Sequence, residues 1–251
     1  MSAERTLSEL ELNRALLARQ GLLERFPSAV PRTLERIGGL QAQYAPSMYV
    51  GLWSRMRDLA REDVTQALRR HSVVAATLMR VGLAEEWIGA PQLTEAEAVQ
   101  QLVRRYLAGF GPASMTDIAS HTGLAKRELA PALEGLRLRR FRDAAGGELL
   151  DVARAPLPDP GTPAPVRFLP TWDATLLVHA RRTGLLPEQH RAKIFHTKNP
   201  HSLPTFLVDG VVVGTWRHRD GHIELAPFNR LDAANLRALR EEADRLAVLH
   251  A

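Results

Sequence analysis

The sequence predicts an α+β fold: tandem winged-helix domains, then a C-terminal region with a β-hairpin and a final helix. Three observations support this prediction. Three helical patterns precede an apolar, strand-like segment within residues 1–90. A helix-turn-helix pattern and two short strand patterns follow in residues 114–152. Near the C-terminus, two alternating strands joined by Asp209-Gly210 are followed by a last amphipathic segment.

Residues 1–90 are predicted to form an N-terminal winged-helix-like domain that opens with an amphipathic helix. Ser8 stands three residues before Glu11, which is the spacing of a capping box. Pro31 is expected to begin a second helix, because proline is tolerated in a first helical turn. A third helix is expected at about residues 62–70. Residues 71–80 are rich in branched apolar side chains and predict a strand.

Residues 91–155 predict a second winged helix. Residues 114–124 have the pattern of the first helix and turn of a helix-turn-helix, and residues 125–136 would form its second helix. Residues 138–152 predict a hairpin wing. The alternative is a helical unit used only for packing, because helix-turn-helix units also serve as scaffolds.

A proline-rich connector, residues 155–165, leads into a C-terminal region at residues 166–251. Asp209-Gly210 between two alternating strands is a strong signal for a type I′ hairpin turn. Asp232 is expected to cap the final helix. We expect this region to pack against the second winged helix.

The charge of the chain favours a polyanionic partner. The net charge is +5, the sequence pI is about 10.2, and only three lysines are present, so most of the positive charge is arginine. The planar fork of arginine donates two parallel hydrogen bonds to phosphate, and a basic pI is typical of nucleic-acid binding. A GC-rich genome would also enrich arginine, so charge alone leaves a generic basic surface as the alternative.

Composition excludes several classes of function. Cysteine is absent, which excludes disulfides, thiolate catalysis and Cys-based metal sites. No apolar run approaches the ~20 residues needed to span a bilayer, and the N-terminus lacks the pattern of a signal peptide. His218 and His222 are spaced like metal ligands, but neither Cys nor a nearby acidic partner accompanies them. We therefore expect no metal, no cofactor and no membrane association, and a monomeric, bacterial, cytoplasmic, nucleoid-associated protein.

One short segment carries the candidate chemistry. Gln41 and Gln43 stand two apart, after Gly38-Gly39 and before Pro46. The proline and the glycine pair disfavour helix here, and on an extended chain residues two apart point to the same face. Both carboxamides would then converge on one water or base edge without adding charge. The alternative is a pair of surface glutamines in a turn, since glutamine is mostly a surface residue.

The sequence resembles the AlkZ/YcaQ-type DNA glycosylases. The matching segments are residues 12–20, 39–43, 49–53, 168–170, 176–177, 179–180, 190–191, 197–199 and 204–216, together with Asp173. That family has a Gln-x-Gln or Gln-x-acid catalytic motif, which corresponds here to Gln41 and Gln43. Two departures stand out. An expected Gly-Thr-x-His-Leu segment and the middle region are missing after Arg80, which indicates an internal deletion of about a hundred residues, a typical domain length. Arg181 replaces an acidic residue that the family often has.

The resemblance implies a monofunctional DNA glycosylase that excises N3- or N7-alkylated, cationic purines from double-stranded DNA. Gln41 or Gln43 would position the attacking water. Tyr44, Met48 and Tyr49 would line the lesion pocket, with core packing as the alternative role for each.

Basic residues along the chain are candidate DNA contacts. Lys126 and Arg127 begin the second helix of the helix-turn-helix, where a groove-facing helix meets DNA. Arg139 and Arg142 would lie along the wing. The remaining candidates are Arg80, Arg181, Arg182, Arg191, Lys193 and Lys198. For the basic residues between positions 181 and 198, the alternative is a solvated basic face. Two rival functions stay open: a non-catalytic winged-helix DNA-binding protein, and a structural remnant or partner module of a larger repair system.

Overall fold

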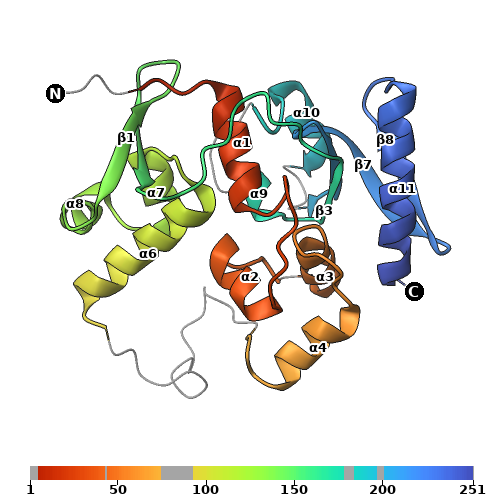
Figure 1. The fold of residues 1–251 in the computed structure, drawn as a ribbon, viewed down its shortest axis with the longest axis horizontal. Coiled ribbons are helices and arrows are strands. Elements are labelled where there is room, and N and C mark those ends of the chain that lie inside the picture. The colour runs from red at the N-terminus through yellow and green to blue at the C-terminus, as the bar shows by residue number, and fades with distance from the viewer. Residues whose placement is uncertain (1–4, 43, 75–92, 178–183, 197–200, 251) are drawn as a thin grey trace.

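The fold is known from a computed structural model that describes residues 5–42, 44–74, 93–177, 184–196 and 201–250. Helices occupy the left and centre of Figure 1, and a sheet with a long C-terminal helix occupies the right. Helix α1 (Glu9–Arg19) lies between these two parts. None of the helices in the described ranges is both long and apolar enough to cross a membrane.

Helix α1 is buried on nearly all sides. Its predicted capping box is confirmed: the Glu11 backbone N–H donates to Ser8 Oγ over 3.2 Å, and the Ser8 N–H donates to Glu11 Oε2 over 2.9 Å. The expectation of an amphipathic helix is wrong, because Asn13 and Arg14 are buried along with the leucines. Their polar groups are satisfied by distant segments. Asn13 Nδ2, for example, donates to Gly184 O over 2.7 Å and to Gly210 O over 2.8 Å.

The N-terminal helices are α2 (Val30–Ile37), α3 (Ala45–Trp53) and α4 (Arg61–Arg69). Helices α2 and α4 match the predicted second and third helices. Helix α3 was not predicted, because Pro46 disfavours the helical conformation of the residue before it. Pro46 lies in the first turn of α3, where no backbone N–H is needed. The predicted strand at residues 71–80 is wrong for residues 71–74, which form a turn and bends, and its remainder lies outside the described residues.

Three helices and a two-stranded antiparallel hairpin follow, and the last two helices and the hairpin have the predicted order. The Ser114 side chain caps the second of these helices, and Gly123, with φ 72°, ends it. The strands pair from Leu138 with Val152 to Arg142 with Glu148. The elements are α6 (Glu95–Phe110), α7 (Met115–Thr122), α8 (Lys126–Glu134), β1 (Leu138–Arg142) and β2 (Glu148–Val152).

The C-terminal part contains an antiparallel sheet in the order β3-β6-β7-β8. The Asp209-Gly210 turn is confirmed: φ is 46° and 75°, positive at both positions as a type I′ turn requires. Asp232 caps the last helix by accepting from the Asn235 N–H over 2.7 Å. The elements are β3 (Arg167–Leu169), α9 (Ala174–Leu177), α10 (Glu188–Ile194), β4 (Phe195–His196), β5 (His201–Ser202), β6 (Thr205–Val208), β7 (Val211–Arg219), β8 (His222–Pro227) and α11 (Ala233–His250).

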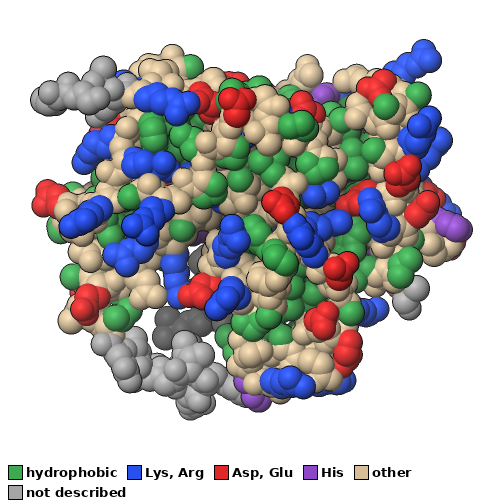
Figure 2. Space-filling model, in the orientation of Figure 1, with side chains coloured by type: hydrophobic (Ala, Val, Ile, Leu, Met, Phe, Trp, Pro, Cys, Tyr) green, Lys and Arg blue, Asp and Glu red, His purple; other side chains and the backbone are tan. Residues whose placement is uncertain are grey.

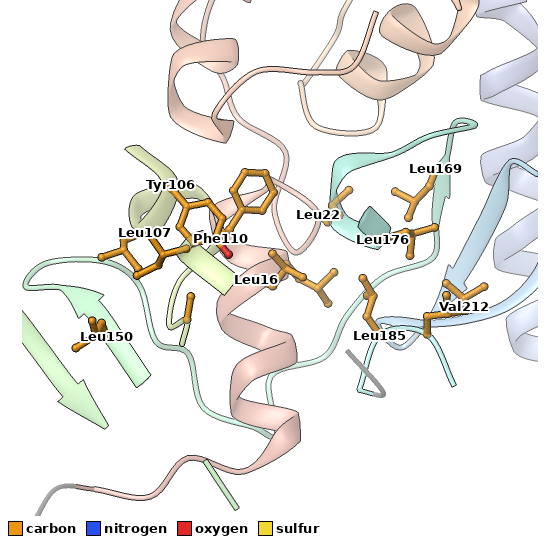
Figure 3. Packing of buried hydrophobic residues seen from close by; sticks show 14 of the residues in the cluster. Leu16, Leu22, Tyr106, Leu107, Phe110, Leu150, Leu169, Leu176, Leu185 and Val212 are labelled. Carbon is orange, nitrogen blue, oxygen red and sulfur yellow. The ribbon is translucent and has the colours of Figure 1, made fainter. Parts of the chain in front are cut away.

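Two apolar clusters hold these parts together, and each draws on distant parts of the chain. In the first cluster, Leu16 of α1 lies between Phe110 of α6 and the C-terminal residues Leu185 and Val212 (Figure 3). The second cluster joins α3 and α4 to the C-terminal sheet and α11. The described part of residues 1–90 therefore shares both clusters with the rest of the chain, and the domain boundaries stay a prediction.

Several arginines lie in the interior as partners of buried carboxylates. Arg19 donates to both carboxylate oxygens of Asp151, over 2.7 and 3.0 Å, and neither side chain is exposed. Arg55 donates to Asp173 over 2.8 Å, and these side chains are also fully buried. The positive charge of the sequence therefore divides into arginines that stabilise the fold and arginines that face solvent.

Candidate active site and nucleic-acid interface

The predicted departure from helix before the glutamines is confirmed. Helix α2 ends at Ile37, and Gly38 and Gly39 follow with φ of 80° and 90°. This left-handed backbone suits glycine, because a Cβ would meet the neighbouring carbonyl. Gln41 then lies exposed in a non-helical segment before α3. Gln43 lies outside the described residues, so the predicted convergence of the two amides stays a prediction.

The backbone of α3 supports the segment that carries Gln41. Leu40 packs over Gly51: a Cβ built at Gly51 would lie 3.2 Å from Leu40 Cδ1 and 3.6 Å from Pro170 Cγ. The glycine thus lets two loops approach one helix closely. The Gly51 carbonyl accepts from Arg55 Nη1 over 2.9 Å, which connects this support to the buried Arg55–Asp173 pair.

An apolar cavity of about 280 Å³ lies beside the same segment. Its lining comes from α2, α3, α4 and the residues that follow α2 and α4, and every described side chain in it is apolar. The lining residues are Val30, Leu34, Gly39, Leu40, Ala42, Met48, Leu52, Val64, Leu68, Val73 and Val74. Ala42, the residue next to Gln41, places the candidate catalytic segment at the wall of this cavity.

A groove of about 800 Å³ lies between α2, α6 and the base of the hairpin. Six arginines and one acidic residue are among the described residues that line it. We call it the arginine groove; its charged residues are Arg19, Glu35, Arg36, Arg104, Arg105, Arg137 and Arg154. Figure 2 shows Lys and Arg side chains on both sides of the hollow between α6 and α2. No local pattern in the sequence indicates this groove.

Comparison with known proteins decides which family has this architecture. A family model described as "DNA glycosylase AlkZ-like" matches residues 34–83 and 80–249, which is most of the chain. The chain belongs to the AlkZ-like DNA glycosylase family. The fold of this AlkZ-like protein is similar to that of Streptomyces sahachiroi DNA glycosylase AlkZ, with a TM-score of 0.79 over 97% of each chain at 14% sequence identity. No relative matches it among the curated proteins. Membership of the family makes DNA the partner.

The matched range includes both glutamines of the AlkZ-like protein. It also includes residues 80–83, where its two segments meet and where the sequence predicted an internal deletion. That part of the chain lies outside the described residues, so the deletion stays a prediction.

The three residues predicted for the lesion pocket occupy different environments in the AlkZ-like protein. Met48 lines the apolar cavity. Tyr44 precedes α3, and 57% of it is exposed. Tyr49 is half-buried against the second apolar cluster, and its hydroxyl lies 3.4 Å from Thr65 Oγ1. The cavity therefore brings Met48 together with leucines and valines of α2 and α4.

The predicted DNA contacts are spread over several surfaces. Lys126 and Arg127 are exposed at the start of α8, and Lys126 Nζ donates to Thr116 Oγ1 over 2.9 Å. Arg142 is exposed on β1, and its Nη1 donates to Gly146 O over 2.9 Å. Arg139 is more enclosed: it pairs with the buried Asp151 and donates to Ala155 O over 2.9 Å.

The C-terminal basic candidates lie on and around α10. Arg191 lies 5.6 Å from the ring of Phe195, and Lys193 lies 4.8 Å from the ring of Phe228. Arg80, Arg181, Arg182 and Lys198 fall outside the described residues, so their predicted DNA contacts stay predictions.

Of the two histidines singled out as possible metal ligands, His218 packs against another ring. His218 stacks on His250, with ring centroids 4.4 Å apart. Burial lowers the pKa of His250, and the nearby His218 contributes in the same direction. Within the described ranges, no group of three or more His, Cys, Asp or Glu residues has the arrangement of a metal site.

Proposed function

We propose that this AlkZ-like protein excises N3- or N7-alkylated, cationic purines from double-stranded DNA by attack of a water held by Gln41 and Gln43. One observation carries the proposal. An exposed, non-helical glutamine segment lies at the wall of an apolar cavity of about 280 Å³, and small ligand sites begin at about 300 Å³. Enzymes that act on a base extrude it from the duplex into such a pocket.

The protein needs to lower the reaction barrier only modestly, because alkylation already makes the purine a good leaving group. A carboxamide oxygen accepts a hydrogen bond from water and thereby orients it toward the far face of the sugar. Its partial negative charge also favours the developing oxocarbenium ion. A glutamine cannot act as a strong base, so we propose that normal purines are not substrates.

The lining of the cavity favours the neutral base that a cationic substrate releases. An apolar site disfavours a charged group and accepts a neutral one. A cationic alkylpurine that enters the cavity becomes neutral when its glycosidic bond breaks. The surroundings of Met48 and Leu34 would therefore favour the departing base over the intact nucleotide, and the polarisable thioether of Met48 suits a planar ring.

The test is single-turnover release of 7-methylguanine from duplex DNA. We expect Gln41→Ala and Gln43→Ala each to slow release by about a hundredfold, the usual effect of removing one transition-state contact. Gln66→Ala is the matched control, because Gln66 is a half-buried glutamine on α4 whose amide contacts Glu62 and which does not line the apolar cavity. Normal release by both glutamine variants would reject the proposed site.

The alternative is a DNA-binding protein without catalysis, built on α7, α8 and the hairpin as a winged helix. The helix order and the position of Lys126 and Arg127 at the start of α8 favour it. Tight, salt-dependent DNA binding without release of any alkylated base would support this function. Failure to bind DNA at low salt would instead support a purely structural role.

A further inference from the structure

We infer that the arginine groove is the site that holds the DNA backbone, and that it supplies more of the DNA affinity than the start of α8 does. This inference rests on the proposed function, in which the polyanion that the protein binds is DNA. It places that DNA on a surface that the helix-turn-helix pattern does not indicate.

The first argument is the balance of charge in the groove. Arg36, Arg104, Arg105, Arg137 and Arg154 are exposed and come from α2, α6 and the two ends of the hairpin. The sixth arginine, Arg19, lies buried and is neutralised by Asp151, so it forms part of the wall. Only one acidic residue is among the described lining residues: Glu35, whose carboxylate lies 3.2 Å from Arg105.

Several exposed arginines elsewhere lie beside acidic residues. Arg217 pairs with Glu224, Arg140 pairs with Glu148, and Arg219 lies 3.5 Å from Asp220. On those surfaces each positive charge has an acidic neighbour, and the local field largely cancels. The groove concentrates uncancelled charge between two walls, which raises the local concentration of a polyanion.

The second argument is the position of the groove relative to the glutamine segment. Both are built on the C-terminal end of α2. Residues two apart on a helix point to nearly opposite faces. Leu34 accordingly lines the apolar cavity and Arg36 lines the groove. Gln41 follows five residues after Arg36. A strand whose phosphates lie in the groove would thus run beside the end of α2 from which the chain continues to Gln41, and an extruded base would reach the cavity around that end of the helix.

The third argument separates this surface from the predicted recognition end of α8. Helix α8 has nine residues, which makes it about 13 Å long at 1.5 Å per residue. Lys126 and Arg127 stand at its start, whereas the groove is lined by residues 135–138, just past its end. The two surfaces can therefore be tested by separate substitutions.

The experiment measures binding of an undamaged fluorescent duplex by anisotropy across a range of NaCl concentrations. The double variant Arg104→Ala/Arg105→Ala is compared with Lys126→Ala/Arg127→Ala, which removes the same charge from the other end of α8. We expect the groove variant to bind roughly tenfold to a hundredfold more weakly. The slope of log K against log salt should fall by about one to two, since each lost phosphate contact contributes ~0.9. The α8 variant should lose less than the groove variant.

A variant that should bind DNA more tightly provides a second and more specific test. Glu35→Gln removes the acidic residue beside Arg105, so DNA should bind several-fold more tightly with a steeper salt slope. Thermal melting of each variant checks that it is folded. The inference is overturned if the groove variant binds like the wild type, if the α8 variant loses more affinity than the groove variant, or if Glu35→Gln leaves binding unchanged.

The two proposals fail in different measurements. Binding of undamaged DNA tests the groove and does not depend on catalysis. Release of 7-methylguanine at saturating DNA tests Gln41 and Gln43 and does not depend on affinity. Suppose that the groove variant loses affinity for undamaged DNA while Gln41→Ala still releases 7-methylguanine at the normal rate. That result would support the groove and reject the glutamine site.

Discussion

Arg55 donates through Nη2 to Asp173 Oδ1 over 2.8 Å, and both side chains are completely buried. Arg55 follows α3, and Asp173 stands between β3 and α9. The Asp173 carboxylate also accepts from the backbone and side chain of Thr175, over 3.0 and 2.6 Å. The pair therefore fixes the segment that brings Pro170 against Gly51, beside the residue that precedes Gln41.

Removing one partner of this pair should destabilise the protein strongly. Asp173→Ala leaves the Arg55 guanidinium buried without its counter-charge, so we expect the free energy of unfolding to fall by about 3–5 kcal/mol. Urea unfolding measures the change. Arg69→Ala is the control, because Arg69 and Glu62 form an exposed pair 3.4 Å apart, and such pairs contribute at most about 1 kcal/mol. Equal losses in the two variants would contradict a structural role for the buried pair.

The left-handed backbone at Gly39 should control the glutamine segment. Its φ is 90°, and no atom outside Gly39 and its two chain neighbours lies within 4 Å of a Cβ built there, so a substitution is opposed by local backbone strain and not by a tertiary clash. Gly39→Ala should cost about 1–2 kcal/mol of stability and slow base release by moving Gln41. Gly39→Asn should be milder, because asparagine tolerates this conformation better. Identical behaviour of the two variants in denaturant melts and single-turnover assays would argue against this strain.

Stability should decline in mild acid because of His190. Its ring is buried and packs 4.6 Å from the Phe228 ring. Burial lowers the pKa of His190 below its ordinary 6.5, and the charge of Lys193 lowers it further. The unfolded chain then binds a proton more readily than the folded one, so the free energy of unfolding is unaffected well above pH 6.5 and decreases as pH falls below it. Denaturant unfolding at pH 7.5 and 5.5 should show a smaller difference for His190→Gln; an unchanged difference would exclude His190 as the cause.

Arg139 should matter more for stability than for DNA. Its guanidinium pairs with the buried Asp151, which also binds Arg19. Arg139→Ala removes one of two counter-charges from a buried carboxylate, and we expect a loss of about 1–3 kcal/mol. DNA affinity, measured by anisotropy on the folded variant, should change far less than it does for Arg104→Ala/Arg105→Ala. If Arg139→Ala instead lost much DNA affinity without a change in the free energy of unfolding, Arg139 would be a DNA contact as first predicted.

Local signals of the sequence predicted much of the fold. Caps at Ser8 and Asp232, the positive-φ pair Asp209-Gly210 and the hairpin of residues 138–152 depend on residues near one another in the chain. Each of these features is present in the structure. The glutamine segment was found in the same way, because Gly38-Gly39 interrupts the helix in front of it.

Features that arise from tertiary contacts were missed. Pattern alone does not distinguish Arg19, which lies in the interior, from Arg36, which lines a groove, since each is an arginine near the end of a helix. The arginine groove combines residues from positions 36 to 154 and exists only when α2, α6 and the hairpin are assembled. Helix α3 was missed for a local reason: Pro46 is compatible with a first turn, but its position was interpreted as a break.

The burial of α1 has a consequence for how the chain reaches its native state. Asn13 donates to Gly210 O over 2.8 Å, and Leu17 belongs to the same cluster as Leu207 and Val212. The hydrogen bond from Asn13 to Gly210 thus joins residues nearly two hundred positions apart in the sequence. Contacts so distant in sequence delay folding, so α1 cannot complete its packing until the C-terminal sheet has formed beside it.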